Sequence, residues 1–265
     1  LDDGTANENT FIGVEAGLMN TTGATNVFIG ADAGRANTTA NHNTFVGTAA
    51  GAATATAGQN TFVGYHAGLQ NTSIHNTFMG FNAGQANTGG AFNTFIGNLS
   101  GVSNNIGNQN TFIGDSSGMA NTNGDANVFI GQGSGDANQS GNENVFIGTD
   151  AGGANTGGDR NVIIGANAGL LSLASDNIFI GHNAGKTNSI ANDNIFIGSG
   201  TGLNNDFGQF NVFMGSDAGA ANVSGINNVY IGFMSGNTST GNNNTYLGKS
   251  TGQVNTTGDQ NTFLG

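Results

Sequence analysis

The chain has 265 residues, with 48 glycines and no proline, cysteine or tryptophan, and its sixteen acidic residues against four lysines and arginines give a formal net charge of −12. This balance disfavours nucleic acid and anionic membrane surfaces as direct partners, because phosphate binding requires clustered lysine and arginine. The lack of cysteine excludes disulfides and thiolate metal sites, and no apolar run approaches the roughly 18 residues of a membrane helix.

One motif recurs along the chain: asparagine, a β-branched residue, an aromatic residue, an aliphatic residue and glycine. Its asparagine stands at positions 9, 26, 43, 60, 76, 93, 110, 127, 144, 161, 177, 194, 211, 228, 244 and 261, so successive copies lie 17 or, three times, 16 residues apart. So short a period fits one coil of a β-solenoid. The sequence therefore predicts an all-β fold, a parallel β-solenoid (β-roll) of about sixteen turns. We expect residues 1–265 to form a single repetitive segment of a longer fibre.

Each turn is expected to begin with a strand, because Val27, Phe28 and Ile29 have the β-branched and aromatic character of strands. Gly30 ends that strand at a corner that needs a positive φ, and Gly34 marks a second bend. A short second strand is expected over residues 35–38. The polar remainder is predicted to be a return loop, since every 16-residue turn lacks a residue there. The corner glycines identified in this way include Gly13, Gly17, Gly30, Gly34, Gly114 and Gly118.

Stacked turns place like residues on like, which predicts three ladders. The aromatic ladder includes Phe11, Phe28, Phe45, Phe62, Phe78, Phe95, Phe112, Phe129, Phe146, Phe179, Phe196 and Phe213. The aliphatic ladder includes Ile12, Ile29, Ile96, Ile113, Ile130 and Ile147. Asparagine amides can bond from turn to turn in a second row that contains Asn20 and Asn37 and in the motif row, or these asparagines only form turns. The motif row includes Asn9, Asn26, Asn43, Asn60, Asn76 and Asn93.

Alternation along a strand sends the aromatic residue to one face and its two neighbours to the other, and both faces are apolar. A turn of 17 residues encloses only one interior, so one of these rows needs a cover from outside the chain. We therefore expect either the aliphatic or the aromatic row to pack against partner chains about a long axis.

The pattern Asn-x-Phe-Ile-Gly-x-x-Ala-Gly, present in residues 26–34, resembles the repeat of the YadA-like head domains of trimeric autotransporter adhesins. Similar repeats occur in tail-fibre-like proteins of phages and in large bacterial surface fibres. The resemblance covers essentially the whole chain and implies a left-handed parallel β-roll, three chains to a rod, on a cell or virion surface. The turn is longer than is usual in that family and phenylalanine replaces a typically small residue, so we expect a wider interior.

Little in the sequence points to chemistry. The four histidines fall at different positions of the repeat with no recurring carboxylate or nucleophile beside them: His42, His66, His75 and His182. Acidic residues occupy the position before the Ala/Ser-Gly pair in some turns (Glu15, Asp32, Asp150, Asp217), but other residue types fill it elsewhere, which leaves an occasional calcium ion as an alternative. We expect no catalytic residue, no metal site and no cofactor.

These observations favour a structural and adhesive fibre segment, a rigid homotrimeric rod outside the cell, on a cell surface or a virion surface. Its expected partners are sister chains and, through repeated loops, host matrix, polysaccharide or neighbouring cells, with no nucleic acid and no direct membrane insertion. The alternatives are a phage tail-fibre shaft and an ice-binding β-solenoid, the latter because a rigid solenoid with regularly spaced threonines can order water on a flat face.

Overall fold

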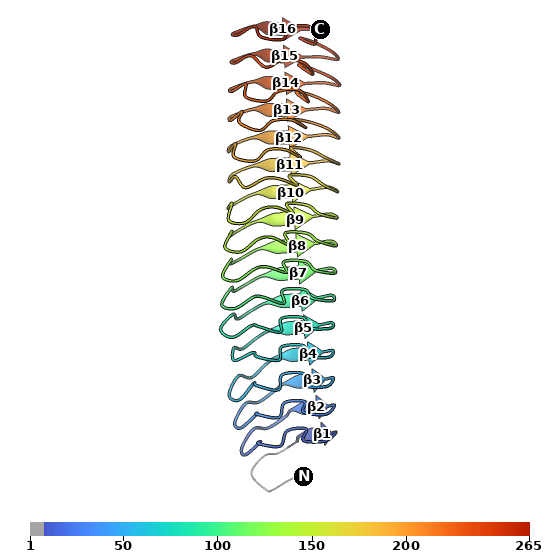
Figure 1. The fold of residues 1–265 in the computed structure, drawn as a ribbon, viewed down its shortest axis with the longest axis vertical. Helices are drawn as coiled ribbons and strands as arrows, with labels where there is room; N and C mark the ends of the chain where they lie inside the picture. Colours follow the sequence, from blue (N-terminus) through green and yellow to red (C-terminus); the bar gives the residue numbers. More distant parts are fainter. Residues whose placement is uncertain (1–7) are drawn as a thin grey trace. The chain divides into compact units, whose positions relative to one another are not determined.

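The computed structural model of the protein describes residues 8–265, which form one three-residue strand in each copy of the motif and no helix (Figure 1). The strands are β1 (Thr10–Ile12), β2 (Val27–Ile29), β3 (Thr44–Val46), β4 (Thr61–Val63), β5 (Thr77–Met79), β6 (Thr94–Ile96), β7 (Thr111–Ile113), β8 (Val128–Ile130), β9 (Val145–Ile147), β10 (Val162–Ile164), β11 (Ile178–Ile180), β12 (Ile195–Ile197), β13 (Val212–Met214), β14 (Val229–Ile231), β15 (Thr245–Leu247) and β16 (Thr262–Leu264). The predicted fold class, an all-β parallel β-solenoid, is confirmed.

The chain divides into two compact units, one ending at Asn127 and one beginning at Val128. We describe them separately as the N-terminal stack, which contains β1–β7, and the C-terminal stack, which contains β8–β16. In each stack every strand pairs in parallel with the next strand along the chain. The register places equivalent residues opposite one another, such as Phe28 and Phe45, because the connection returns to the same point after 16 or 17 residues.

The aromatic row lies inside its own turns and forms the core. Its phenylalanines from Phe28 to Phe213 are fully buried, and neighbouring rings stack almost parallel, with centroids 4.8 Å apart for Phe45 and Phe62 and 4.9 Å apart for Phe196 and Phe213. Each ring packs on the second glycine of its turn: a Cβ on Gly34 would lie 2.6 Å from the ring of Phe28. A larger residue at this glycine would therefore collide with the core.

Both predicted corners have positive φ angles, 135° at Gly30 and 58° at Gly34. The second strand expected over residues 35–38 is wrong, because this part of the chain is a run of turns. Asp32 also has a positive φ of 59°. Gly30, Asp32 and Gly34 therefore bend the chain three times directly before residue 35, and it does not enter this segment as an extended backbone. The backbone closes short turns instead, with the amide of Arg35 donating to Asp32 (3.2 Å) and that of Asn37 to Gly34 (2.9 Å).

The two asparagine rows bond in different ways. In the second row amide meets amide, as the Nδ2 of Asn37 donates to the Oδ1 of Asn20 at 2.6 Å. In the motif row the side chain bonds the backbone: the Oδ1 of Asn26 accepts from the amide N–H of Asn43 at 2.9 Å, and its Nδ2 donates to the carbonyl of Ala40 at 2.8 Å. A motif asparagine such as Asn26 therefore links its turn to the next and closes its own return loop, while the Nδ2 of Asn60 and Asn194 donates to the loop just before the motif instead.

Thr54 interrupts the second asparagine row, which makes it a test of that row. Thr54 is fully buried and the Oδ1 of Asn37, one turn earlier, has no hydrogen-bond partner. We expect Thr54→Asn to stabilise the N-terminal stack by about 1 kcal/mol, because its Nδ2 can donate to Asn37. The bond that Thr54 now donates to the carbonyl of Asn71 (2.9 Å) is lost in exchange. A higher thermal midpoint than that of the exposed control Thr56→Asn checks the prediction, and a lower one would contradict it.

Candidate interaction surface

The first and third residues of every strand point away from the aromatic core and form two parallel rows. The outer aliphatic row is the set of third residues, Ile12, Ile29, Val46, Val63, Met79, Ile96, Ile113, Ile130, Ile147, Ile164, Ile180, Ile197, Met214, Ile231, Leu247 and Leu264. Within the stacks Met79 is 42% exposed and Ile231 39% exposed, while many others are half-buried. The structure thus decides which apolar row lies inside: the aromatic row is enclosed, and the aliphatic row faces outward.

The outer β-branched row consists of the first residues of the strands. In β3–β7 it is threonine throughout, and in β8–β14 it is valine or isoleucine throughout. Neither outer row contains a charged residue in any of the described strands. We name the two rows together the strand face. It is apolar in β8–β14 and half hydroxyl, half aliphatic in β3–β7.

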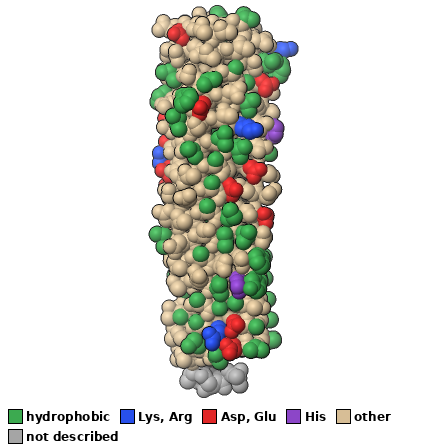
Figure 2. Space-filling view, in the orientation of Figure 1, with side chains coloured by type: hydrophobic (Ala, Val, Ile, Leu, Met, Phe, Trp, Pro, Cys, Tyr) green, Lys and Arg blue, Asp and Glu red, His purple; other side chains and the backbone are tan. Residues whose placement is uncertain are grey.

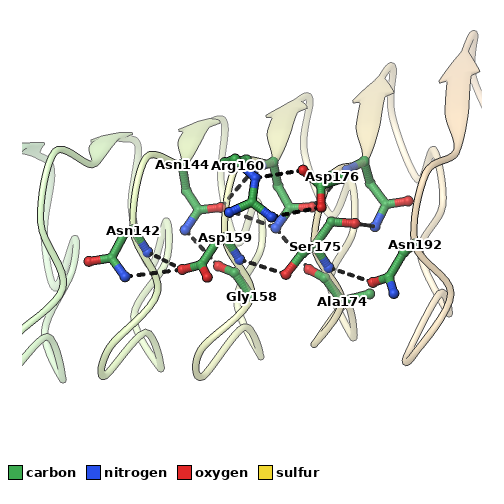
Figure 3. Close-up of polar contacts among 11 residues, drawn as sticks. Asn142, Asn144, Gly158, Asp159, Arg160, Ala174, Ser175, Asp176 and Asn192 are labelled. Atoms are coloured by element: carbon green, nitrogen blue, oxygen red, sulfur yellow. Dashed lines mark hydrogen bonds and ion pairs between the residues drawn. The ribbon is translucent and has the colours of Figure 1, made fainter.

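In some turns a charged residue stands beside the strand face, at the position before the motif asparagine. In the C-terminal stack this position holds Glu143, Arg160, Asp176 and Asp193 in successive turns. The Nε of Arg160 lies 2.7 Å from the Oδ1 of Asp176 (Figure 3). This contact raises the pKa of the Arg160 guanidinium and lowers that of the Asp176 carboxyl, and both groups are exposed. Figure 2 shows how sparse such charges are on one face of the molecule, among spread hydrophobic and polar side chains.

A third polar row closes the side of the turn next to these charges. The amide N–H of Asn142 donates to the Oδ1 of Asp159 (2.7 Å), that of Asp159 to the Oγ of Ser175 (3.0 Å), and that of Ser175 to the Oδ1 of Asn192 (2.8 Å) (Figure 3). Here the later side chain accepts from the earlier turn, the reverse of the motif asparagines. The sequence reasoning missed this row, although Asn, Asp or Ser recurs two residues before the motif asparagine.

Threonines of the return loops are also used within the stack. The Oγ1 of Thr21 donates to the carbonyl of Thr38 (2.9 Å), and the Oγ1 of Thr38 donates to the carbonyl of Ala55 (3.1 Å). The same pattern recurs at Thr240, which donates to the carbonyl of Thr256. These hydroxyls tie one turn to the next and offer little to an external water lattice.

The chain matches no protein-family model, no curated protein and no solved structure.

The residues considered for chemistry do not converge. His66 stacks on Tyr65 (3.7 Å between centroids), His75 on Phe92 (4.8 Å), and His182 lies beside Asn183. Residues 8–265 contain no group of three His, Cys, Asp or Glu side chains that could hold a metal ion. In the same residues there is no helix long and apolar enough to cross a membrane. The position before the Ala/Ser-Gly pair, where calcium was the alternative, is one at which the backbone is left-handed. Its residues include Glu15, Asp32 and Asp150.

Tyr230 is a buried titratable group whose pKa is shifted by the fold of the C-terminal stack. Burial raises its pKa to about 12, although its hydroxyl donates to the Oγ of Ser239 at 3.0 Å. Between pH 10 and 12 the unfolded chain releases a proton that the folded chain keeps, so stability falls as pH rises through this window, by on the order of 2 kcal/mol.

We expect Tyr230→Phe to remove this alkaline loss, while costing about 1 kcal/mol at pH 7 for the lost hydrogen bond. Urea unfolding of the two proteins at pH 7 and at pH 11.5 measures both effects. An equal loss of stability in both proteins at the higher pH would contradict the assignment.

Proposed function

We propose that this chain is a structural and adhesive segment of an extracellular fibre on a cell or virion surface, in which three copies assemble into a rod. The observation that carries the proposal is the strand face: the aromatic row fills the interior of each turn, and a second apolar row is left outside. Soluble monomers rarely expose a contiguous apolar stripe of this kind. A cover supplied by sister chains removes it from water.

Sister chains suit this face because of its period. The outer rows repeat at every turn of each stack, and a second copy of the chain repeats at the same interval, so contacts made at one turn recur at the next. The strand face also has the composition of an interface centre, free of charge, with Glu143, Arg160, Asp176 and Asp193 at its edge. The resemblance to the repeats of trimeric autotransporter adhesins supports three copies and a surface location.

Adhesion follows from the return loops. Their exposed residues differ from turn to turn, as with Thr39, Ile106 and Phe207, while the stack holds them at regular intervals. Weak contacts with host matrix, polysaccharide or neighbouring cells then add up through avidity. A phage tail-fibre shaft would use the same architecture. Ice binding is less well supported, because return-loop threonines such as Thr38 donate their hydroxyls to the backbone and valine or isoleucine replaces the strand threonines in β8–β14.

The oligomeric state tests the assembly. Sedimentation equilibrium of the purified chain should give three times the mass of 26.4 kDa. The double variant Ile147→Lys/Ile180→Lys, which places two charges on the strand face of the C-terminal stack, should sediment as a monomer. Its circular dichroism should stay unchanged, because both side chains point away from the core.

Thr156→Lys is the matched control, since Thr156 is an exposed return-loop residue, and it should remain a trimer. A wild-type chain that stays monomeric at micromolar concentration would overturn the assembly. Binding of the wild-type protein to immobilised matrix proteins, polysaccharides and cells then separates an adhesin from a spacer: saturable binding supports adhesion, and its absence leaves a structural shaft.

A further inference from the structure

Three turns have 16 residues instead of 17: residues 60–75, 161–176 and 228–243. In each of these turns the interior holds the third motif residue and, nine positions later, a buried polar residue. These pairs are Phe62 with Asn71, Ile163 with Ser172, and Tyr230 with Ser239. Because the three turns share their length, these pairs can be compared directly.

In two of the three turns the core pair forms both a ring stack with the neighbouring turns and a side-chain hydrogen bond. Phe62 stacks on Phe45 and Phe78, with centroids 4.8 and 4.9 Å away, and the Oδ1 of Asn71 accepts from the Nδ2 of Asn87 at 2.6 Å. In the third turn serine replaces the asparagine, but the hydroxyl of Tyr230 reaches the Oγ of Ser239. The Tyr230 ring also stacks on Phe213 and Tyr246, with centroids 4.7 and 4.8 Å away.

The turn of residues 161–176 has neither the ring stack nor the side-chain hydrogen bond. Ile163 replaces the ring, so the aromatic stack is interrupted between Phe146 and Phe179. Ser172 is fully buried and its Oγ has no hydrogen-bond partner. A buried polar atom without a partner costs free energy, and each lost ring contact removes a further stabilising term.

We propose that the turn of residues 161–176 is a built-in weak joint, the place where the C-terminal stack opens first under heat, denaturant or pulling force. In a solenoid each turn contacts only its neighbours, so the stack parts where the contact between neighbours is weakest. Opening there leaves β8–β9 and β11–β16 with their own ring stacks, Phe129 on Phe146 and Phe179 on Phe196. This proposal does not depend on the proposed function.

Opening of the joint can be detected by proteolysis, because the outer side of this turn carries exposed leucines. Leu171 is 47% exposed and Leu173 45% exposed, and Phe207 in the turn of residues 194–210 is 51% exposed. In that second turn Phe196 stacks on both sides, and the Oδ1 of Asn205 accepts from the Nδ2 of Asn222 at 2.7 Å. The two loops offer similar side chains to a protease, and they differ in the cores beneath.

Native-state hydrogen exchange with mass spectrometry, in increasing urea, tests the proposal. Protection factors of the amides in residues 161–176 should be at least about 10-fold lower than those in residues 194–210. Thermolysin, which cuts before apolar residues, should cleave the native protein first between Gly169 and Leu173 and only later beside Phe207. Equal protection in the two turns, or first cleavage at Phe207, would overturn the proposal.

Two variants test whether Ile163 and Ser172 cause the low protection of this turn. Ile163→Phe/Ser172→Asn restores the ring and the amide, and should raise protection of residues 161–176 to the level of residues 194–210. Ser172→Ala removes the unpartnered hydroxyl without adding volume, and should slow exchange in the same turn. Should the double variant fail to fold, Ser172→Ala still decides the matter, because faster exchange in it would show that the hydroxyl stabilises the turn.

Discussion

Replacing Gly97 with alanine is expected to lower the free energy of unfolding of the N-terminal stack by at least about 4 kcal/mol, at the extreme of single substitutions. Gly97 ends β6 with a φ of 139°, and a Cβ there would lie 2.3 Å from the carbonyl oxygen of Gly114 in the next turn. Backbone atoms cannot move aside as a flexible side chain can. The two turns would have to separate, which would break the strand pairing of β6 with β7.

Gly89→Ala is the matched control in the neighbouring return loop. Gly89 is exposed, and its added Cβ would meet only the side chain of the exposed Ile106, with the Cγ2 at 3.3 Å and the Cβ at 3.9 Å. We expect this variant to be neutral or to gain up to about 1 kcal/mol, because alanine reduces the freedom of the unfolded chain. Urea unfolding followed by circular dichroism measures both variants. Similar midpoints for the two would contradict the close approach of successive turns.

Phe196→Ala is the second large effect, with an expected loss of about 3–5 kcal/mol in the C-terminal stack. The Phe196 ring is fully buried, lies between Phe179 (5.0 Å) and Phe213 (4.9 Å), and covers Gly202, where a Cβ would be 2.5 Å away. Truncation leaves a cavity that the turn cannot close, since the rings above and below are held by their own glycines.

Phe207→Ala provides the comparison, because it removes an exposed ring from the same turn. Its unfolding free energy should stay within about 0.5 kcal/mol of wild type. Thermal melts of the two variants at equal concentration are sufficient. If Phe207→Ala proved as costly as Phe196→Ala, the return loop rather than the aromatic row would hold the turn together, and the assignment of the core would be wrong.

The same geometry links stability to the proposed role. Each turn is held by its neighbours through stacked rings, motif asparagines such as Asn43 and return-loop bonds such as that from Asn142 to Asp159. The exposed loop side chains between these fixed points can vary at little cost, since many bonds between successive loops join backbone atoms, such as that from Thr38 to Ala55. A segment that keeps its core constant and its loops variable suits a fibre that presents many weak contacts.

The sequence by itself determined the elements whose signals are local. The motif predicts every strand, because β-branched and aromatic residues at successive positions favour an extended backbone, and glycine at Gly30 and Gly34 predicts the two corners with positive φ. The 16- or 17-residue period predicts the parallel pairing of like with like, because equal connections return the chain to the same register.

Only the tertiary structure decided which apolar row is inside. Alternation along a strand separates Phe28 from Val27 and Ile29 but does not say which side the turn encloses, and that depends on Gly34 lying beneath the ring. The left-handed backbone at Asp32, which directly precedes the turns found in place of the expected second strand, has no residue signature, since Ala49, His66 and Leu99 occupy the same position. Those residues are held in the left-handed region by hydrogen bonds to neighbouring turns, such as that from Ala49 to Ala31, and such bonds exist only once the turns are stacked.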